Sequence, residues 1–237
     1  MKDFIEIISK YISTYLMTFV HVLSRPHEFA KNLPGSEEKV YADAITFFSI
    51  SIVCVQFIRA PLFDINHQLF STISIEISQQ IIFFIIEAGF LSVIFKILSV
   101  RSSVLSTFVL SSYLFSVANI IFNIGVLLAF LSSKRGCFGD LTNIEQIEFK
   151  PAKVVCDILR DMDGDLLNNV TDIFNIFLML LSALGMFGFL IWGVLAWQAY
   201  GVLHTISIER AYAGMIVFAL AQAVLFFAML TMFPPVF

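Results

Sequence analysis

Long apolar runs separated by charged segments dominate the chain. Five runs approach or exceed the roughly 17 to 25 residues that a helix needs to cross a bilayer. They extend over residues 42–58, 73–98, 104–131, 173–200 and 211–233. A helix pairs its backbone groups within the segment, as a lipid-embedded chain requires, and the alternation typical of a membrane β-barrel is absent from the sequence. The pattern predicts an all-α polytopic bundle with five transmembrane helices.

The first 24 residues show a different, amphipathic pattern. Polar side chains share one helical face and apolar side chains occupy the rest: Asp3, Glu6, Lys10, Ser13, Thr18 and His21 against Phe4, Ile5, Ile8, Tyr11, Ile12, Tyr15, Leu16, Phe19 and Leu23. This periodicity predicts a helix that lies in the plane of the membrane interface. A sixth, weakly hydrophobic span is the alternative. A signal peptide is not expected, because charges interrupt the run and no small-residue cleavage site follows.

These runs divide the chain into four parts. Residues 1–40 form a cytoplasmic, interfacial amphipathic helix and linker; 41–131 hold transmembrane helices 1–3; 132–172 form an acidic loop; and 173–237 hold helices 4–5. The side with the N-terminus carries eight Lys and Arg residues and the other side six, five of them in the acidic loop. The bias predicts a cytoplasmic N-terminus and an extracytoplasmic C-terminus.

Composition strengthens the membrane interpretation. The chain is 59% hydrophobic and only 14% charged, with 27 Phe and a mean hydropathy of +0.90, well outside the range of soluble domains. The expected partners are the lipid bilayer and a membrane-protein partner or a second copy of the chain. Its net charge of −4 gives no reason to expect a nucleic acid.

Several polar residues stand at mid-membrane depth. Glu87 is near the middle of the run 73–98, where an acidic residue costs roughly 2.5 to 3.5 kcal/mol. We expect one polar cluster from three helices: Glu87, Ser116, Asn119, Asn123 and Gln222. Such a cluster could hold the helices together, titrate or bind a cation, or line a water-filled vestibule.

The acidic loop holds two further candidates. Cys137 and Cys156 could close a disulfide in a non-cytoplasmic loop, or remain two unrelated thiols. In "DMDGDLLNNVTD", Asp161, Asp163 and Asp165 match positions 1, 3 and 5 of a calcium loop, but the glycine stands two positions early. An acidic solvated loop or a helix cap is therefore the competing interpretation.

No catalytic signature stands out. The chain contains no H-E-x-x-H, G-x-S-x-G, P-loop or C-x-x-C motif, and its four histidines are dispersed. Each histidine is expected at an interface rather than in a metal site. We therefore expect a non-enzymatic protein without a cofactor or metal.

Small residues indicate a helix-packing face in the fourth run. Ser182, Gly185 and Gly188 recur at intervals of three, so they share one side of the expected helix. Small side chains let membrane helices approach closely. This side is a predicted contact face.

The chain resembles the Yip family of Rab-GTPase-interacting membrane proteins and their bacterial relatives. The resemblance rests on "VLSRPHEFAKNL" before the first span, on five hydrophobic spans, and on "WQAYGVLHTISIERAYAGMIV" between the last two. Where the eukaryotic branch has an Asp-Leu-x-Gly-Pro-type motif, this chain has "RAPLFD", and the long cytosolic tail is missing. The resemblance thus implies the bacterial branch, in the inner membrane, and gives no support for GTPase binding.

Two functions remain open from the sequence. The resemblance implies a non-enzymatic scaffold that organises membranes or partner proteins. The alternative is a small transporter or channel component that moves a proton, cation or lipid past Glu87, although the five runs show no inverted repeat. Replacing Glu87 by Gln distinguishes them, because neutralisation is mild in a scaffold and abolishes flux in a carrier.

Overall fold

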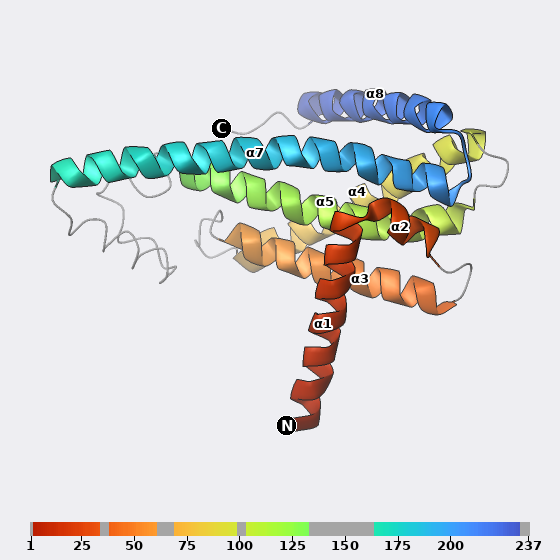
Figure 1. The fold of residues 1–237 in the computed structure, drawn as a ribbon, viewed down its shortest axis with the longest axis horizontal. Coiled ribbons are helices and arrows are strands. Elements are labelled where there is room, and N and C mark those ends of the chain that lie inside the picture. The colour runs from red at the N-terminus through yellow and green to blue at the C-terminus, as the bar shows by residue number, and fades with distance from the viewer. Residues whose placement is uncertain (1, 34–37, 61–68, 99–102, 133–163, 233–237) are drawn as a thin grey trace. The chain divides into compact units, whose positions relative to one another are not determined.

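A computed structural model describes residues 2–33, 38–60, 69–98, 103–132 and 164–232. Within these ranges the chain is all helical, as predicted, and no strand occurs. The helices follow one another along the chain (Figure 1): α1 (Lys2–Ser24), α2 (Pro26–Lys31), α3 (Glu38–Arg59), α4 (Leu69–Leu98), α5 (Val104–Ser132), α7 (Gly164–Leu203) and α8 (Ile208–Met232).

Four helices in the described part of the chain are long and apolar enough to cross a membrane. The spans are Lys39–Arg59 in α3, Ile73–Leu98 in α4, Val104–Ala129 in α5 and Ile176–Leu203 in α7. Serine and threonine hydroxyls within them donate to the carbonyl four residues earlier, as Thr46, Ser92 and Ser116 do. This bond satisfies a hydroxyl that hydrocarbon cannot solvate. The four helices indicate an integral membrane protein.

The chain forms two compact units. Unit 1 contains Met1–Ser49, Ile81–Val117 and Trp192–Phe237, and unit 2 contains Ile50–Gln80 and Ala118–Ile191. Each of the four long apolar helices therefore contributes one part to unit 1 and another to unit 2.

Aromatic rings build the core of unit 1. Phe84 of α4 lies 4.3 Å from Phe48 of α3, between ring centroids, and 5.0 Å from Phe108 of α5. Phe95 is fully buried, and its ring stacks on Tyr200 of α7 at 5.1 Å. Offset and edge-to-face ring pairs pack tightly at such separations, so these contacts join α3, α4, α5 and α7 within the unit.

An elbow joins α1 to α2, and both helices pack against the rest of unit 1. α1 runs across the direction of α3 (Figure 1), with Tyr15 4.7 Å from Phe47 between ring centroids. α2 begins with Pro26, a residue suited to the first helical turn, and packs Phe29 edge-on against Tyr113 of α5 at 4.8 Å. This short helix lies in the segment that the sequence pattern left as a linker.

A tight turn connects α7 to α8. The N–H of Ile206 donates to the carbonyl of Gly201 at 3.0 Å, and the N–H of Thr205 to that of Val202 at 3.2 Å. This pair of bonds is a Schellman motif, which satisfies the last carbonyls of a helix. Thr205 occupies its left-handed position, with φ of 51°. His204 is the residue just before it and is buried.

Candidate functional site

Glu87 and Gln222 meet inside unit 1. Glu87 projects from α4, and the Nε2 of Gln222 in α8 donates to its Oε1 at 3.2 Å. Both side chains are half-buried. An amide that hydrogen-bonds a carboxyl group lowers the cost of holding that group in an apolar environment.

Two further polar pairs in unit 1 join α5 to α7. The Oγ1 of Thr107 lies 3.0 Å from the Nε2 of His204, and the Oγ of Ser111 lies 2.8 Å from the hydroxyl of Tyr200. All four side chains are buried. Thr107 and Ser111 are one helical turn apart in α5, and Tyr200 and His204 are one turn apart at the end of α7. Because the earlier residue of α5 meets the later residue of α7, the two helices run antiparallel here. We name these four residues the α5–α7 polar ladder.

The ladder belongs to the same unit as the Glu87–Gln222 pair. Phe95 covers the ladder on one side, with its ring centroid 5.1 Å from that of Tyr200 and 4.9 Å from that of His204. Burial lowers the pKa of His204 to about 4, so the imidazole is neutral at neutral pH. Unit 1 thus holds three separate polar pairs, Glu87–Gln222, Ser111–Tyr200 and Thr107–His204.

The ladder was missed by the sequence analysis, which expected His204 at an interface. A signal was available, because Thr107 and Ser111 are spaced by four residues, and so are Tyr200 and His204. Such spacing places each pair on one helical face. The sequence alone does not indicate that these two helical faces contact each other.

The predicted asparagines belong to unit 2. The Nδ2 of Asn119 donates to the Oε1 of Gln80 at 3.2 Å. The Nδ2 of Asn123 donates to both the backbone carbonyl and the Oδ1 of Asn119, each at 2.8 Å. Ser116 lies in unit 1, buried, and donates to the carbonyl of Ser112 at 2.6 Å. The predicted cluster is therefore distributed over two units, with Glu87 and Gln222 paired in one and the asparagines in the other.

Unit 2 contains two polar features that the sequence analysis did not single out. Arg59, at the end of α3, forms an ion pair with Glu76 of α4, with Nη2 and Oε1 3.0 Å apart. Gln56 is only 8% exposed, and within the described part of the chain neither its Oε1 nor its Nε2 has a hydrogen-bond partner. A buried amide without a partner is unusual in a folded protein.

The candidates of the acidic loop cannot be placed in the same way. Cys137, Cys156, Asp161 and Asp163 lie outside the described residues, and Asp165 is near the start of α7 with an undescribed side chain. In the described ranges, no three His, Cys, Asp or Glu side chains gather closely enough to hold a metal ion. The disulfide and the calcium loop stay predictions.

The four long apolar helices in the described part of the chain indicate a helical integral membrane protein. Comparison with protein families, with characterised proteins and with solved structures yields no match for the chain. The resemblance to the Yip family stays a prediction from the sequence.

Proposed function

We propose that the protein is a non-enzymatic scaffold subunit of the membrane, which binds another membrane protein or a second copy of itself. The observation that carries the proposal is the exposure of α7. Only 11% of its membrane-spanning window is buried, against 33 to 39% in the spans of α3, α4 and α5. A helix that packs so little within its own chain has most of its surface available to lipid or to another helix.

The exposed surface of α7 includes the two glycines of the predicted packing face, Gly185 and Gly188, whereas Ser182 is partly buried and donates to the carbonyl of Gly125 in α5 at 3.5 Å. A Cβ added at Gly185 or Gly188 would meet no described atom within 4 Å. Large apolar side chains flank these glycines, with Leu184 68% and Phe187 64% exposed. Glycines let two backbones approach closely in lipid, where van der Waals packing drives helix association. The face therefore supports contact with a further membrane helix.

The proposal includes a topology. α8 acts as the fifth span, the N-terminus lies in the cytoplasm, and the C-terminus lies outside the bacterial inner membrane. α1 lies in the interface plane, supported by its course across α3 (Figure 1) and by its exposed apolar side chains Ile12, Leu16 and Val20.

Native mass spectrometry after mild solubilisation tests the scaffold. We expect the wild type to retain a partner or form a defined oligomer, and Gly185→Leu with Gly188→Leu to lose it. Ala183→Leu is the matched control, because Ala183 is exposed and lies on the opposite side of α7, roughly 160° from Gly185. A wild type that is monomeric and alone in several mild detergents would contradict the proposal, as would equal losses in variant and control.

A second candidate, a component that moves protons, is favoured by one observation. The Glu87–Gln222 pair and the α5–α7 polar ladder place polar and ionisable side chains within the otherwise apolar helices of unit 1. Ionisable groups within spans are often part of proton pathways. Proton flux into liposomes that is lost in Glu87→Gln and retained in Glu76→Gln would favour this candidate. Background-level proton flux in the wild type, in Glu87→Gln and in Glu76→Gln alike would exclude this candidate.

A further inference from the structure

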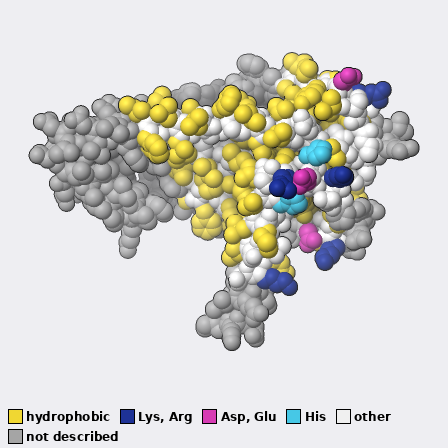
Figure 2. Space-filling model, viewed as in Figure 1, with side chains coloured by type: hydrophobic (Ala, Val, Ile, Leu, Met, Phe, Trp, Pro, Cys, Tyr) yellow, Lys and Arg dark blue, Asp and Glu magenta, His cyan; other side chains and the backbone are white. Residues whose placement is uncertain are grey.

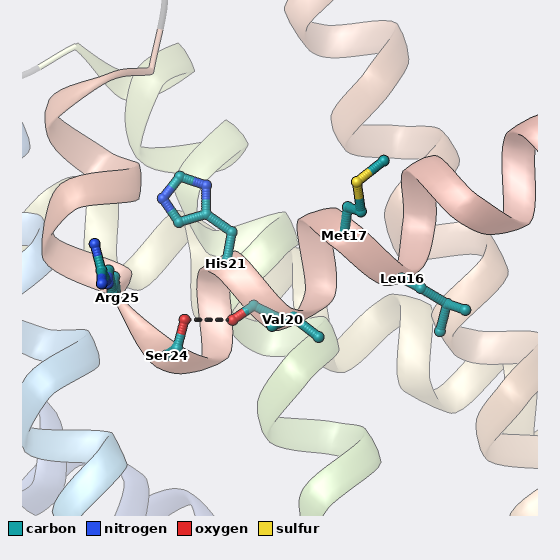
Figure 3. A pocket seen from close by; sticks show the side chains of 6 residues that line it. All are labelled: Leu16, Met17, Val20, His21, Ser24 and Arg25. Atoms are coloured by element: carbon teal, nitrogen blue, oxygen red, sulfur yellow. Dashed lines mark hydrogen bonds between the residues drawn. The ribbon is translucent and has the colours of Figure 1, made fainter.

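An open groove follows α1 toward the elbow. Two rows of side chains line it, each spaced by four residues: Leu16, Val20 and Ser24, and Met17, His21 and Arg25 (Figure 3). Its volume is about 610 Å³. Both rows begin with apolar side chains and end with polar ones, so the groove changes from apolar to basic along roughly 12 Å of helix.

The polar end of the groove is held in place by packing beneath it. Val22 is fully buried, and Pro26 and Ala30 of α2 are buried as well. Phe29 lies edge-on to His21, with 5.6 Å between ring centroids, and contacts Tyr113 of α5 on its other side. The elbow is therefore packed against the rest of unit 1 without a ligand, and this preorganisation lowers the entropic cost of binding.

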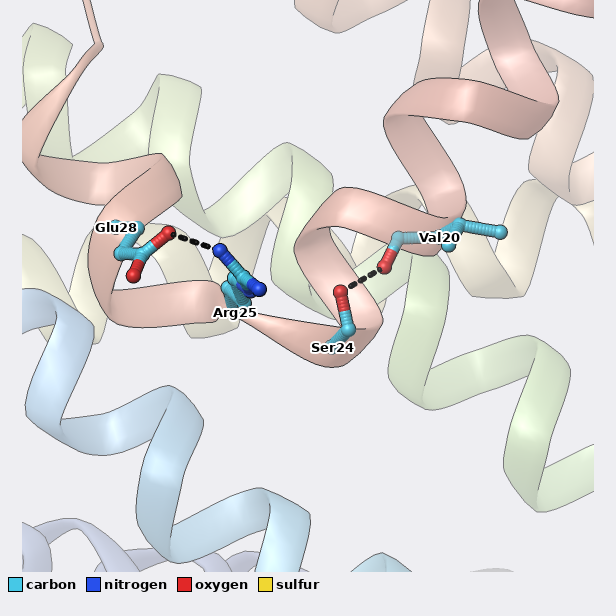
Figure 4. Close-up of polar contacts among 4 residues, drawn as sticks. All are labelled: Val20, Ser24, Arg25 and Glu28. Carbon is cyan, nitrogen blue, oxygen red and sulfur yellow. Dashed lines mark hydrogen bonds and ion pairs between the residues drawn. The ribbon is translucent and has the colours of Figure 1, made fainter.

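The hydrogen-bond donors at this end are His21 and Arg25. The Oγ of Ser24 donates to the carbonyl of Val20 at 2.7 Å, so this hydroxyl is already used (Figure 4). The Nη1 of Arg25 pairs with the Oε2 of Glu28 at 3.2 Å, and both side chains are more than half exposed. A guanidinium has five N–H donors, so one such bond leaves most of them for another anion.

Basic side chains gather around the elbow. On the face shown in Figure 2, Lys, Arg and His side chains surround a single acidic group near α2. His27 and Lys31 are exposed there beside Arg25 and Glu28. An exposed apolar strip that ends in basic groups complements a phospholipid, whose phosphate adjoins its acyl chains.

We propose that the α1–α2 elbow binds one anionic phospholipid, with its phosphate at Arg25 and His21 and its acyl chain along Val20, Met17 and Leu16. The inference rests on the interfacial position of α1 in the proposed topology and is independent of any partner of α7. A guanidinium fork matches the oxygen atoms of a phosphate, which makes Arg25 the main determinant.

Native mass spectrometry with defined lipids tests the site. The protein in detergent is mixed with phosphatidylglycerol or with phosphatidylcholine of the same acyl chains. We expect the wild type to retain one phosphatidylglycerol in preference to phosphatidylcholine. Arg25→Gln should weaken that retention roughly fivefold, the factor for one cation at an anionic membrane surface. Arg25→Lys should weaken it less, because it keeps the charge and loses the fork.

Two matched variants distinguish a specific lipid site from nonspecific electrostatic attraction of the lipid. Lys31→Gln removes the same charge from α2 outside the groove, and we expect it to leave retention nearly unchanged. Met17→Gln keeps every charge and disrupts the apolar end, and we expect it to lower retention of phosphatidylglycerol. Equal losses in Arg25→Gln and Lys31→Gln would overturn the proposal, as would full retention in Met17→Gln.

A third arm identifies the source of the phosphate. Added inorganic phosphate should leave bound phosphatidylglycerol in place; displacement would show that the elbow takes a free anion and would overturn the lipid proposal. The same spectra report protein partners separately. Loss of lipid in Arg25→Gln with partner or oligomer intact supports the lipid site alone, and loss of the partner in the α7 variants with lipid intact concerns the scaffold alone.

Discussion

The Nε2 of His204 and the Oγ1 of Thr107 lie 3.0 Å apart in a buried pair that joins the end of α7 to the start of α5. The imidazole also lies against the ring of Phe95. An imidazolium at this position would lose much of its hydration, so burial favours a neutral histidine.

Acid should therefore destabilise unit 1. Burial lowers the pKa of His204 from 6.5 to about 4. The unfolded chain takes up the proton near pH 6.5 and the folded chain only near 4. The neutral imidazole therefore contributes its full stabilisation to the folded state above about pH 6.5. This contribution is lost as the pH falls toward 4, and the free energy of unfolding falls by about 2 kcal/mol by pH 5. Thermal unfolding in detergent at a series of pH values measures it.

Variants assign this pH dependence to one histidine. His204→Gln can still hydrogen-bond Thr107, and we expect its stability to change little between about pH 7 and 5. His27→Gln, at an exposed position, should follow the wild type. An unchanged acid sensitivity in His204→Gln would refute the assignment.

Glu87 should tolerate neutralisation better than loss of its partner. Glu87→Gln keeps a hydrogen bond to Gln222, and we expect a change in the free energy of unfolding of less than about 0.6 kcal/mol, the average for such bonds in membranes. Gln222→Leu leaves the carboxyl group without that amide and should cost up to ~1.7 kcal/mol. Denaturant titration in mixed micelles compares the two; a larger cost for Glu87→Gln would contradict the pairing.

Gly214 should resist enlargement. A Cβ at this position would lie 2.7 Å from the Cδ1 of Leu98 and 3.3 Å from the Cγ2 of Ile94. We expect Gly214→Val to cost about 1 to 3 kcal/mol through overpacking between α8 and α4. Gly89→Val carries the same β-branch in a helix of the same unit, but a Cβ at Gly89 meets no described atom within 4 Å. Melting temperatures should fall clearly only for Gly214→Val.

Arg59 and Glu76 of the ion pair in unit 2 should be energetically coupled in unfolding. Glu76 is 15% exposed and Arg59 32%, so removal of one partner leaves a partly buried charge. We expect Arg59→Met to cost about 1 to 3 kcal/mol, and the double variant with Glu76→Leu to recover much of it. A double-mutant cycle of unfolding free energies provides the measurement, and strictly additive costs would argue against the contact.

Hydropathy predicted the long helices well because the length of an apolar run is visible directly along the sequence. The run 104–131 corresponds to α5, which covers Val104–Ser132, and the run 73–98 ends with α4 at Leu98. α2 was not predicted, since six residues are too few for a periodic signal and its stability comes from the packing of Phe29 on Tyr113.

Depth along a span was predictable, but rotation about its axis was not. Glu87 and Asn119 were grouped because both stand near mid-membrane depth. In the structure Gln222 contacts Glu87, whereas Asn119 contacts Gln80. Which faces meet depends on the rotation of each helix and on the bulk of residues such as Phe84 and Phe95, and a single sequence leaves that rotation undetermined.

Substitution of Thr205 offers a way to make the protein more stable in detergent. Its φ of 51° belongs to a backbone region that β-branched residues rarely occupy, and a Schellman motif usually has glycine there. Thr205→Gly should relieve roughly 1 kcal/mol of backbone strain, partly offset by the greater freedom of glycine in the unfolded chain. The side chain of Thr205 is exposed, so its removal sacrifices little packing. A longer half-life in detergent would make this one substitution a starting point for crystallisation.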